Sequence, residues 1–543
     1  MRPVGELPSP ERPNRLRLAG LAASATLSAG AYGAGAPLTG PVEAAAPDTW
    51  GYWLGLAGWV AGLAALAGIW WRLGARVRRR PASVPLGWLL RTGLLWATPL
   101  LVAPPIASRD AYAYACQGAL WLDAVDPYAV GVLPGGCVWS DAVPALWRDT
   151  PSPYGPLALA LAGGAVAVAR LVGTSTDGQL LVAVALLRVQ ALAGVVLVAG
   201  FLPRLARAGG LDPVQACWLG LVSPLVLVHA VGGAHNDALV LGLVVSALSL
   251  AAGGPSAFGT PMMRLRRGAS RAGLGAAPGG LGAAPGGLSA APGGLGASRA
   301  GFITGALLGL AVAIKITAIV ALPFALLIIT VRPGVLPDRR QIAASVTAGS
   351  AGSVLAFAAV TRATGLDLGW ISALSDTGRL VQWTSVPTGL GMAAGYLLRL
   401  AGQPDAVDAA VTAARLLGFV ALAGAIAALL VRAGQAVAAP DPTRARRRLV
   451  TLTGLAFTAL ALLSPIFYPW YGLIAVTVLA AGLRAWRQVH RVAVAVIVLS
   501  FLVLPGGLGL AVLTKLPGAL FDVALVAVLT AVAYRRWRSR SRR

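Results

Sequence analysis

Charged residues are scarce in this chain. They make up 12% of its 543 residues, against roughly 25% in an average soluble domain. Acidic residues are the scarcest: there are 19 of them against 44 Lys and Arg, and no glutamate follows Glu43. Hydrophobic residues make up 57% of the chain, and its mean hydropathy is +0.76. A soluble enzyme needs a more highly charged surface and a disordered protein needs low hydrophobicity, so both classes are excluded.

Arginine carries almost all of the net charge of +25, because Lys315 and Lys515 are the only lysines. In a soluble protein this excess would indicate a nucleic-acid partner. In a membrane protein it indicates cytoplasmic loops that are rich in arginine. The apolar composition favours the second interpretation, so we expect a membrane-lipid environment and no nucleic-acid partner.

Apolar segments that are long enough to cross a bilayer recur along the whole sequence. They cover approximately residues 17–37, 51–72, 85–105, 155–174, 179–202, 212–231, 237–253, 301–331, 342–361, 409–431, 449–466, 469–484, 491–513 and 517–534. The segment 301–331 is too long for one span and has Lys315 near its middle, so we expect two short helices there. Backbone polar groups cannot stay unpaired in lipid, which favours helices. We therefore expect one all-α, polytopic membrane domain over residues 1–543, with about 13 to 15 transmembrane helices.

The placement of arginine predicts the orientation of the spans. Cytoplasmic arginines are expected at Arg12–Arg17, Arg78–Arg80, Arg444–Arg448 and Arg535–Arg543. We therefore expect a multi-pass protein of the plasma membrane with both termini in the cytoplasm. The first apolar segment is long for a signal peptide, which favours an uncleaved span. Strict alternation of the spans fails in 155–207 and 386–402, where one segment each is expected to be short, re-entrant or interfacial.

Two long segments do not resemble spans. Residues 254–300 include a seven-residue repeat with one Pro and several Gly per unit, which excludes a helix within the repeat and predicts a flexible cytoplasmic linker. Residues 106–154 hold five of the sixteen aspartates together with Tyr and Trp, so we expect an external catalytic loop there. Cys116 and Cys137 both lie in that loop, where a disulfide can form on the oxidising side of the membrane.

The triplet Ser108-Arg109-Asp110 comes directly after the third apolar segment. One interpretation is a helix cap with a charge pair at the interface. The other is a catalytic carboxylate beside a guanidinium that binds phosphate, because an Asp base needs a polar and partly water-excluded setting. A helix starting there would bring Tyr112, Tyr114 and Gln117 close to Asp110, with Tyr114 nearest at i+4.

A second polar cluster, Gly232-Gly-Ala-His235-Asn236-Asp237, lies between two spans on the same external side. His235 is a candidate proton shuttle or phosphate contact, and together with His229 and Asp237 a weaker candidate for a metal site. The alternative is a Gly-rich turn whose Asn and Asp cap the next helix. Lys315 is a third candidate, because a lysine in an apolar run is costly and usually functional. Its alternative role is to extend toward the headgroups.

Aromatic residues gather at Ser464-Pro-Ile-Phe-Tyr468-Pro-Trp470-Tyr471, either as an aromatic belt at the membrane interface or as a surface for stacking on sugar rings. A second external segment holds further polar and aromatic side chains suited to sugar binding: Arg362, Asp367, Trp370, Asp376, Arg379, Gln382 and Trp383. The sequence contains neither the GxxxxGK[ST] phosphate loop nor HExxH. It also has no segment long enough for a nucleotide-sugar domain, so a sugar donor would have to be linked to lipid.

These residues together resemble the polyprenol-phosphate-mannose-dependent α-1,6-mannosyltransferases. The run from Ser108 to Gly118 is similar to that family's SRDxYxYxxQG pattern. The similarity continues in Asp126-Pro-Tyr128, Pro151-Ser-Pro-Tyr154-Gly-Pro156, Gly232-Gly-Ala-His235-Asn236-Asp237 and Pro469-Trp470-Tyr471. It extends over residues 100–475, and it is interrupted by the insert 254–300 and by Cys116, where the family pattern has Ala.

The resemblance implies a membrane glycosyltransferase of the GT-C type that builds the α-1,6-mannan core of lipomannan and lipoarabinomannan in the cell envelope. It implies Asp110 as the catalytic base on the extracytoplasmic face, polyprenyl-phosphate-mannose as donor, a growing mannan as acceptor, and inversion at the anomeric carbon. Arg109 and Lys315 are then the candidates to stabilise the leaving lipid phosphate, so no metal or other cofactor is required. The other matched residues are expected to bind substrate: Tyr112, Tyr114, Gln117, Tyr154, His235, Asn236, Asp237, Trp470 and Tyr471.

Two other functions would share many of these features. A lipid-linked-sugar flippase would also have apolar spans and external cations, although transporters usually place charges near the midplane and show repeated halves. A GT-C transferase of another lipid-linked sugar, such as an arabinofuranosyl donor, would share the catalytic chemistry.

Overall fold

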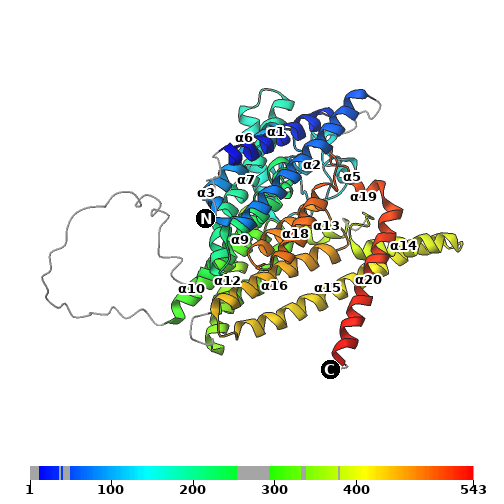
Figure 1. The fold of residues 1–543 in the computed structure, drawn as a ribbon. Helices are drawn as coiled ribbons and strands as arrows, with labels where there is room; N and C mark the ends of the chain where they lie inside the picture. Colours follow the sequence, from blue (N-terminus) through cyan, green and yellow to red (C-terminus); the bar gives the residue numbers. More distant parts are fainter. Residues whose placement is uncertain are drawn as a thin grey trace, which may run out of the picture.

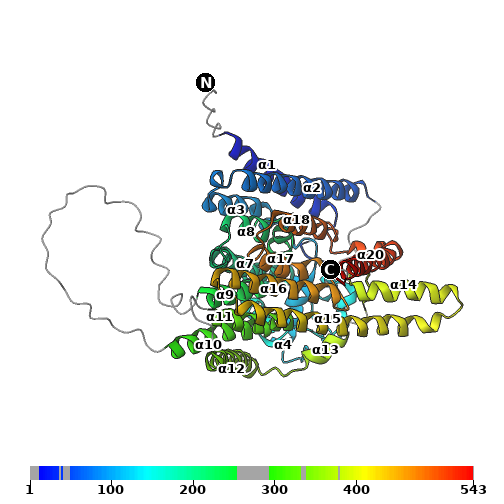
Figure 2. The same ribbon diagram turned by 60° about the horizontal axis from the view of Figure 1, so that its bottom comes forward.

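The computed structural model describes residues 11–35, 38–40, 49–253, 293–331, 338–376 and 380–541. Within these residues the regular secondary structure is helical, and the β structure is limited to one isolated bridge between Val503 and Gly509. The predicted all-α fold is therefore confirmed. Figure 1 and Figure 2 show the helices stacked side by side, with the hairpin of α14 (Val386–Leu400) and α15 (Val407–Val437) projecting beyond the others.

The remaining helices follow one another with short connections. They are α1 (Glu11–Gly33), α2 (Trp50–Arg79), α3 (Leu86–Val102), α4 (Asp110–Leu122), α5 (Ala145–Arg148), α6 (Pro156–Val172), α7 (Thr176–Ala208), α8 (Pro213–Gly220), α9 (Asp237–Gly253), α10 (Gly293–Val312), α11 (Ala321–Thr330), α12 (Arg339–Thr364), α13 (Trp370–Asp376), α16 (Pro442–Leu463), α17 (Gly472–Ala480), α18 (Trp486–Ser500), α19 (Leu510–Leu513) and α20 (Lys515–Ser541). Three shorter helical segments matter for the site: the π-helix η4 (Val226–Gly232) and the 3-10 helices η7 (Ile316–Val320) and η10 (Pro469–Tyr471).

Local sequence signals explain where many of these helices begin. The side chains of Asp212, Ser385 and Asp441 accept hydrogen bonds from backbone N–H groups in the first turns of α8, α14 and α16. Such caps satisfy donors that have no partner inside the helix. Each of these three helices also has proline in its first turn, where the missing N–H costs nothing.

Among the described residues, five helices are long and apolar enough to cross a membrane: α2, α7, α12, the helix Pro404–Val437 that includes α15, and the helix Lys515–Ser539 within α20. The pair η4 and α9 passes the same test together but is bent by 111°. Shorter apolar helices, including α3, α6 and α17, lie in other predicted spans. The chain is thus a multi-pass helical membrane protein, whereas the predicted number of 13 to 15 spans stays a prediction.

The segment 301–331 is divided into two helices, as predicted. α10 ends at Val312 and η7 begins at Ile316, so Lys315 lies at the break, with extended backbone. The predicted linker 254–300 falls mostly outside the described residues, but its boundary differs from the prediction because α10 already begins at Gly293. The last proline of the repeat is Pro292, so no proline opposes a helix beyond it.

α4 is the helix that positions the site, and it is almost entirely buried although it lies in the predicted external loop. It packs with α6 and α7 in an apolar core separate from the larger core of the bundle. Its last turn is tied to α12, because the Trp121 Nε1–H donates to the carbonyl oxygen of Thr364 at 3.1 Å. A disulfide from Cys116, in the middle of α4, to Cys137 attaches the following segment to this helix.

α10 and α12 cross with their backbones in direct contact. A Cβ atom at Gly305 would overlap the carbonyl oxygen of Gly349, and Gly301 and Gly309, one turn away on either side, also face the backbone of α12. Membrane helices often use small residues in this way, because close approach strengthens van der Waals packing.

Replacing Gly305 by Ala is expected to force α10 and α12 apart and to lower the free energy of unfolding by about 1–3 kcal/mol. The measurement is thermal unfolding of the purified protein in detergent. Gly200→Ala on α7 is the matched control, since a Cβ at Gly200 would meet nothing within 4 Å. Equal melting temperatures of the two variants would contradict the expected overlap.

Candidate active site

Asp110 is the first residue of α4, and the backbone before it is held in an unusual conformation. Ala107 has a φ of 58°, and its N–H donates to the carbonyl oxygen of Pro505 at 2.9 Å. The Ser108 Oγ then accepts a hydrogen bond from the Asp110 N–H at 3.0 Å. A carboxylate at this position is also stabilised by the partial positive charge of the helix N-terminus. These contacts fix the Asp110 side chain, which is 14% exposed.

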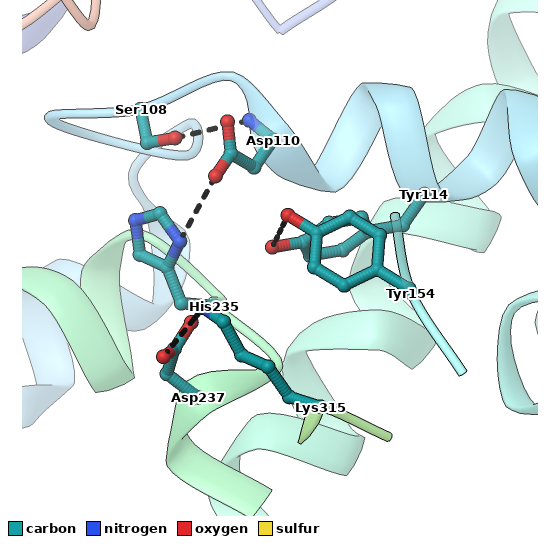
Figure 3. A network of polar contacts seen from close by, with 7 residues as sticks. All are labelled: Ser108, Asp110, Tyr114, Tyr154, His235, Asp237 and Lys315. Carbon is teal, nitrogen blue, oxygen red and sulfur yellow. Dashed lines mark hydrogen bonds and ion pairs between the residues drawn. The ribbon is translucent and has the colours of Figure 1, made fainter. Parts of the chain in front are cut away.

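His235 lies beside this carboxylate (Figure 3). Its Nδ1 is 3.4 Å from the Asp110 Oδ2, and its side chain is fully buried. The turn that delivers it follows η4, and Ala234 within that turn has a φ of 54°. The imidazole ring stacks on Trp470, with ring centroids 4.1 Å apart and an interplanar angle of 22°. Trp470 in turn stacks on Tyr468 at 4.6 Å, so a continuous aromatic column supports the imidazole beside Asp110.

Lys315 and Asp237 form a second pair in the same region (Figure 3). The Lys315 Nζ donates to both carboxylate oxygens of Asp237 at 2.8 Å, and it lies 4.2 Å from the centre of the Tyr471 ring. The side chains of Lys315 and Asp237 are 11% and 3% exposed. Asp237 begins α9 and Lys315 occupies the break after α10, so the pair joins two elements that are 78 residues apart in the sequence.

Tyr114 and Tyr154 line the other side of the site. Their hydroxyl oxygens are 3.4 Å apart, and their rings meet edge to face at 5.1 Å. Burial, and to a smaller extent the nearby charge of Asp110, raises the pKa of both hydroxyl groups well above the ordinary value. Both therefore stay protonated near neutral pH and can donate hydrogen bonds to a sugar.

A small cavity of about 50 Å³ is enclosed by these groups. Its walls are Asp110, Ala113, Tyr114, Gln117, Trp147, Thr150, Pro151, Pro153, Tyr154, Ile466, Tyr468, Trp470 and Tyr471. A carboxylate on a wall that is otherwise largely aromatic suits a sugar, since ring faces pack against C–H groups while the carboxylate engages a hydroxyl. Asn236, which was also predicted, instead lines a smaller neighbouring cavity together with Tyr114, Gln117 and Tyr154.

Arg109 and Tyr112 were predicted to contact substrate, but the structure gives them other partners. The Arg109 guanidinium donates to the carbonyl oxygens of Ala142 at 2.7 Å and Gly40 at 3.2 Å, and it lies 4.1 Å from the Tyr112 ring. The Tyr112 hydroxyl donates to the carbonyl oxygen of Leu38 at 2.9 Å. Burial raises the pKa of Tyr112 to about 12. The two side chains join the segments around residues 38–40 and 142 to the start of α4, and neither lines the cavity beside Asp110.

Other predicted contacts are brought together only in part. Gln382 reaches the aromatic column, with its Nε2 donating to the Tyr468 hydroxyl at 3.4 Å, whereas Trp383 bonds instead to Thr514. Arg379 lies outside the described residues. The rings of His229 and His235 are 5.9 Å apart, but no group of three potential metal ligands occurs within the described part of the chain.

A larger cavity of about 480 Å³ adjoins the small one. The two cavities share Pro153, Tyr154, Ile466 and Tyr471 as wall residues. Lys315 lines the larger cavity, and so does Arg415 on α15, which was not among the predicted residues. A signal for Arg415 exists in the sequence, because it is a cation within the apolar segment 409–431, as Lys315 is within 301–331.

Comparison with known proteins yields matches over most of the chain. The sequence profile described as "Alpha-(1->6)-mannopyranosyltransferase, N-terminal domain" matches residues 17–331, and that of the "MptB C-terminal domain" matches residues 387–535. No solved structure matches the chain.

Curated relatives agree with these profiles. An alpha-(1->6)-mannopyranosyltransferase of Mycobacterium tuberculosis is 32% identical over 408 residues, which is 74% of this chain and 66% of the relative. A probable alpha-(1->6)-mannopyranosyltransferase of Mycolicibacterium smegmatis is 31% identical, with 82% and 75% covered, and alpha-(1->6)-mannopyranosyltransferase B of Corynebacterium glutamicum is 28% identical, with 84% and 68% covered. The chain therefore belongs to the alpha-(1->6)-mannopyranosyltransferase family of glycosyltransferases.

Proposed function

We propose that this protein transfers mannose from polyprenyl-phosphate-mannose to the 6-hydroxyl group of a growing α-1,6-mannan, the core of lipomannan. The names of its relatives support the sugar and the linkage. The observation that carries the proposal is the pair of adjoining cavities, one with a carboxylate and aromatic walls and the other mainly apolar with cations. Such a site suits a donor whose sugar and lipid parts need different surroundings.

Asp110 acts as the general base in this proposal. The acceptor O6 attacks the anomeric carbon while its proton passes to the Asp110 carboxylate. The bond between that carbon and the phosphate oxygen breaks, and the polyprenyl phosphate leaves with the electron pair. A β-linked donor then gives an α-linked product, which requires a single inverting displacement and one base. His235, whose Nδ1 is 3.4 Å from the carboxylate, helps to orient it.

Lys315 is proposed to stabilise the charge that develops on the leaving phosphate. It lines the larger cavity, and its ammonium group is held by Asp237 and Tyr471. A cation that is fixed before the reaction stabilises developing charge without reorganisation. A monophosphate leaving group handled in this way needs no metal ion.

The site is proposed to face the outside of the cell, with both termini in the cytoplasm. The disulfide between Cys116 and Cys137 supports this orientation, because disulfides persist in oxidising compartments. Both cysteines belong to the part of the chain that surrounds Asp110.

The proposal is tested with the full chain in proteoliposomes, labelled polyprenyl-phosphate-mannose and a short α-1,6-mannoside. We expect transfer of mannose with an α-1,6 linkage in the product, assigned by NMR of the anomeric carbon. Transfer from a polyprenyl-linked arabinofuranose in place of mannose would identify a different transferase. Translocation of the intact lipid across the bilayer without transfer would identify a flippase. Either result would overturn the proposal.

A further inference from the structure

The larger cavity has the composition of a site for a lipid phosphate. Side chains of α15, of η7 and of the segment 464–466 form most of its wall, and its volume is about 480 Å³. Its lining includes two cations, Lys315 and Arg415, and no carboxylate. A cavity with this charge attracts an anion, and its apolar area suits a hydrocarbon chain.

Arg415 is held at the wall of this cavity by contacts from outside it. Its Nε donates to the Thr388 Oγ1 at 3.1 Å, and an Nη donates to the carbonyl oxygen of Leu380. Thr388 is fully buried, and its hydroxyl donates to the carbonyl oxygen of Pro465 at 2.6 Å. The guanidinium is therefore oriented before any ligand arrives, which reduces the entropy lost on binding.

The surface of α15 around Arg415 is apolar and exposed. Leu416, Leu417 and Val420 are 60%, 70% and 70% exposed, and Phe419 is 48% exposed. Leu416 and Phe419 also line the cavity, so the cavity reaches a helix face suited to contact with lipid. A cation in such a helix is costly, and its retention indicates a polar partner within the membrane.

We propose that Arg415 binds the phosphate of the lipid-linked donor together with Lys315, and that the prenyl chain leaves the cavity along α15 past Leu416 and Phe419. This inference rests on the proposed function. The planar guanidinium can donate two parallel hydrogen bonds to phosphate oxygens, which a lysine cannot do. The sugar then lies toward Asp110, because Tyr154 and Tyr471 line both cavities and mark the boundary between them.

The first test compares Arg415→Gln with Arg432→Gln in the full chain. Arg432 is exposed on the same helix, about 25 Å along its axis, and does not line the cavity. We expect Arg415→Gln to weaken the binding of polyprenyl monophosphate and to raise KM for the donor by about tenfold or more, the effect of losing a charged hydrogen bond. Arg432→Gln is expected to change neither value, and Arg415→Lys is expected to recover part of the affinity.

Competing ligands separate the phosphate from the lipid. Inorganic phosphate is expected to compete weakly and phosphatidylglycerol vesicles not at all, since the cavity is proposed to take the phosphate and the prenyl chain together. Equal displacement of polyprenyl monophosphate by phosphatidylglycerol would mean that the cavity takes membrane lipid in general, and would overturn the inference.

A second pair of variants covers a loss of folding, because Arg415 also contacts Thr388 and Leu380. Thr412 is exposed on α15 and lines the cavity, so Thr412→Trp fills it without removing a buried contact. We expect Thr412→Trp to weaken the binding of polyprenyl monophosphate, and Leu417→Trp, outside the lining, to leave it unchanged. Unchanged binding in both Arg415→Gln and Thr412→Trp would overturn the inference even if the wild type transfers mannose. Arg415-dependent binding in a protein without transferase activity would instead overturn the proposed function alone.

Discussion

Asp110→Asn is expected to lower the rate of mannosyl transfer by about 10²–10⁴-fold, the contribution of a general base in other enzymes. The amide has nearly the shape of the carboxylate, so the helix start and the hydrogen bond from the Asp110 N–H to Ser108 are retained. The amide cannot accept the proton of the acceptor hydroxyl, because its oxygen is only weakly basic. The measurement is the single-turnover rate with saturating donor and acceptor, which separates chemistry from binding.

The matched control for this variant is Asp123→Asn, at the other end of α4. Asp123 forms an exposed ion pair with Arg170 at 2.7 Å and lines neither cavity. Exposed pairs contribute little to stability, so this variant is expected to keep both its fold and its rate. Donor binding is expected to persist in Asp110→Asn. A full rate in that variant would remove Asp110 as the base.

Lys315→Met is expected to have two effects, because it removes a buried charge that serves both the fold and the leaving group. It leaves the nearly fully buried carboxylate of Asp237 without its partner, which is expected to lower the free energy of unfolding by about 3–5 kcal/mol. It is also expected to reduce transfer strongly in whatever protein remains folded. Both are measured on the same preparation, by thermal unfolding and by a transfer assay below the melting temperature.

Two further variants separate these effects. Lys515→Met changes the only other lysine, which is exposed at the start of α20, and is expected to change neither stability nor rate. The double variant Lys315→Met with Asp237→Asn leaves no unpaired charge, so it is expected to recover most of the stability. It is not expected to recover transfer. If the double variant is as active as the wild type, Lys315 has a structural role only.

The sequence was sufficient to predict the helical membrane fold and to single out the residues that form the site. The apolar composition and the recurrence of long apolar segments required helices, and the position of Lys315 within 301–331 correctly indicated a break there. The number of spans is harder to obtain, because Gly and Pro interrupt apolar segments without changing their hydropathy. The segment 212–231, for example, is divided between α8 and η4.

Side-chain direction and distant pairing could not be predicted in the same way. Arg109 and Asp110 are adjacent, but successive residues at a helix start point to different sides, so only Asp110 faces the cavity. Asp237 and Lys315 each lie in apolar surroundings that require a partner, yet no local pattern identifies that partner 78 residues away. Arg415 carried the same signal as Lys315, but its significance depends on a cavity that the sequence does not reveal.

The close crossing of α10 and α12 has a consequence for how much error the site can tolerate. Lys315 follows the end of α10, and α4, which begins with Asp110, is tied at its other end to the last residue of α12. The proposed base and the proposed phosphate-binding cation are thus both registered against α12, one through a glycine contact and one through an indole hydrogen bond. A shift of α12 would move both groups in concert, whereas a methyl group at Gly305 would change their separation, to which the reaction is far more sensitive.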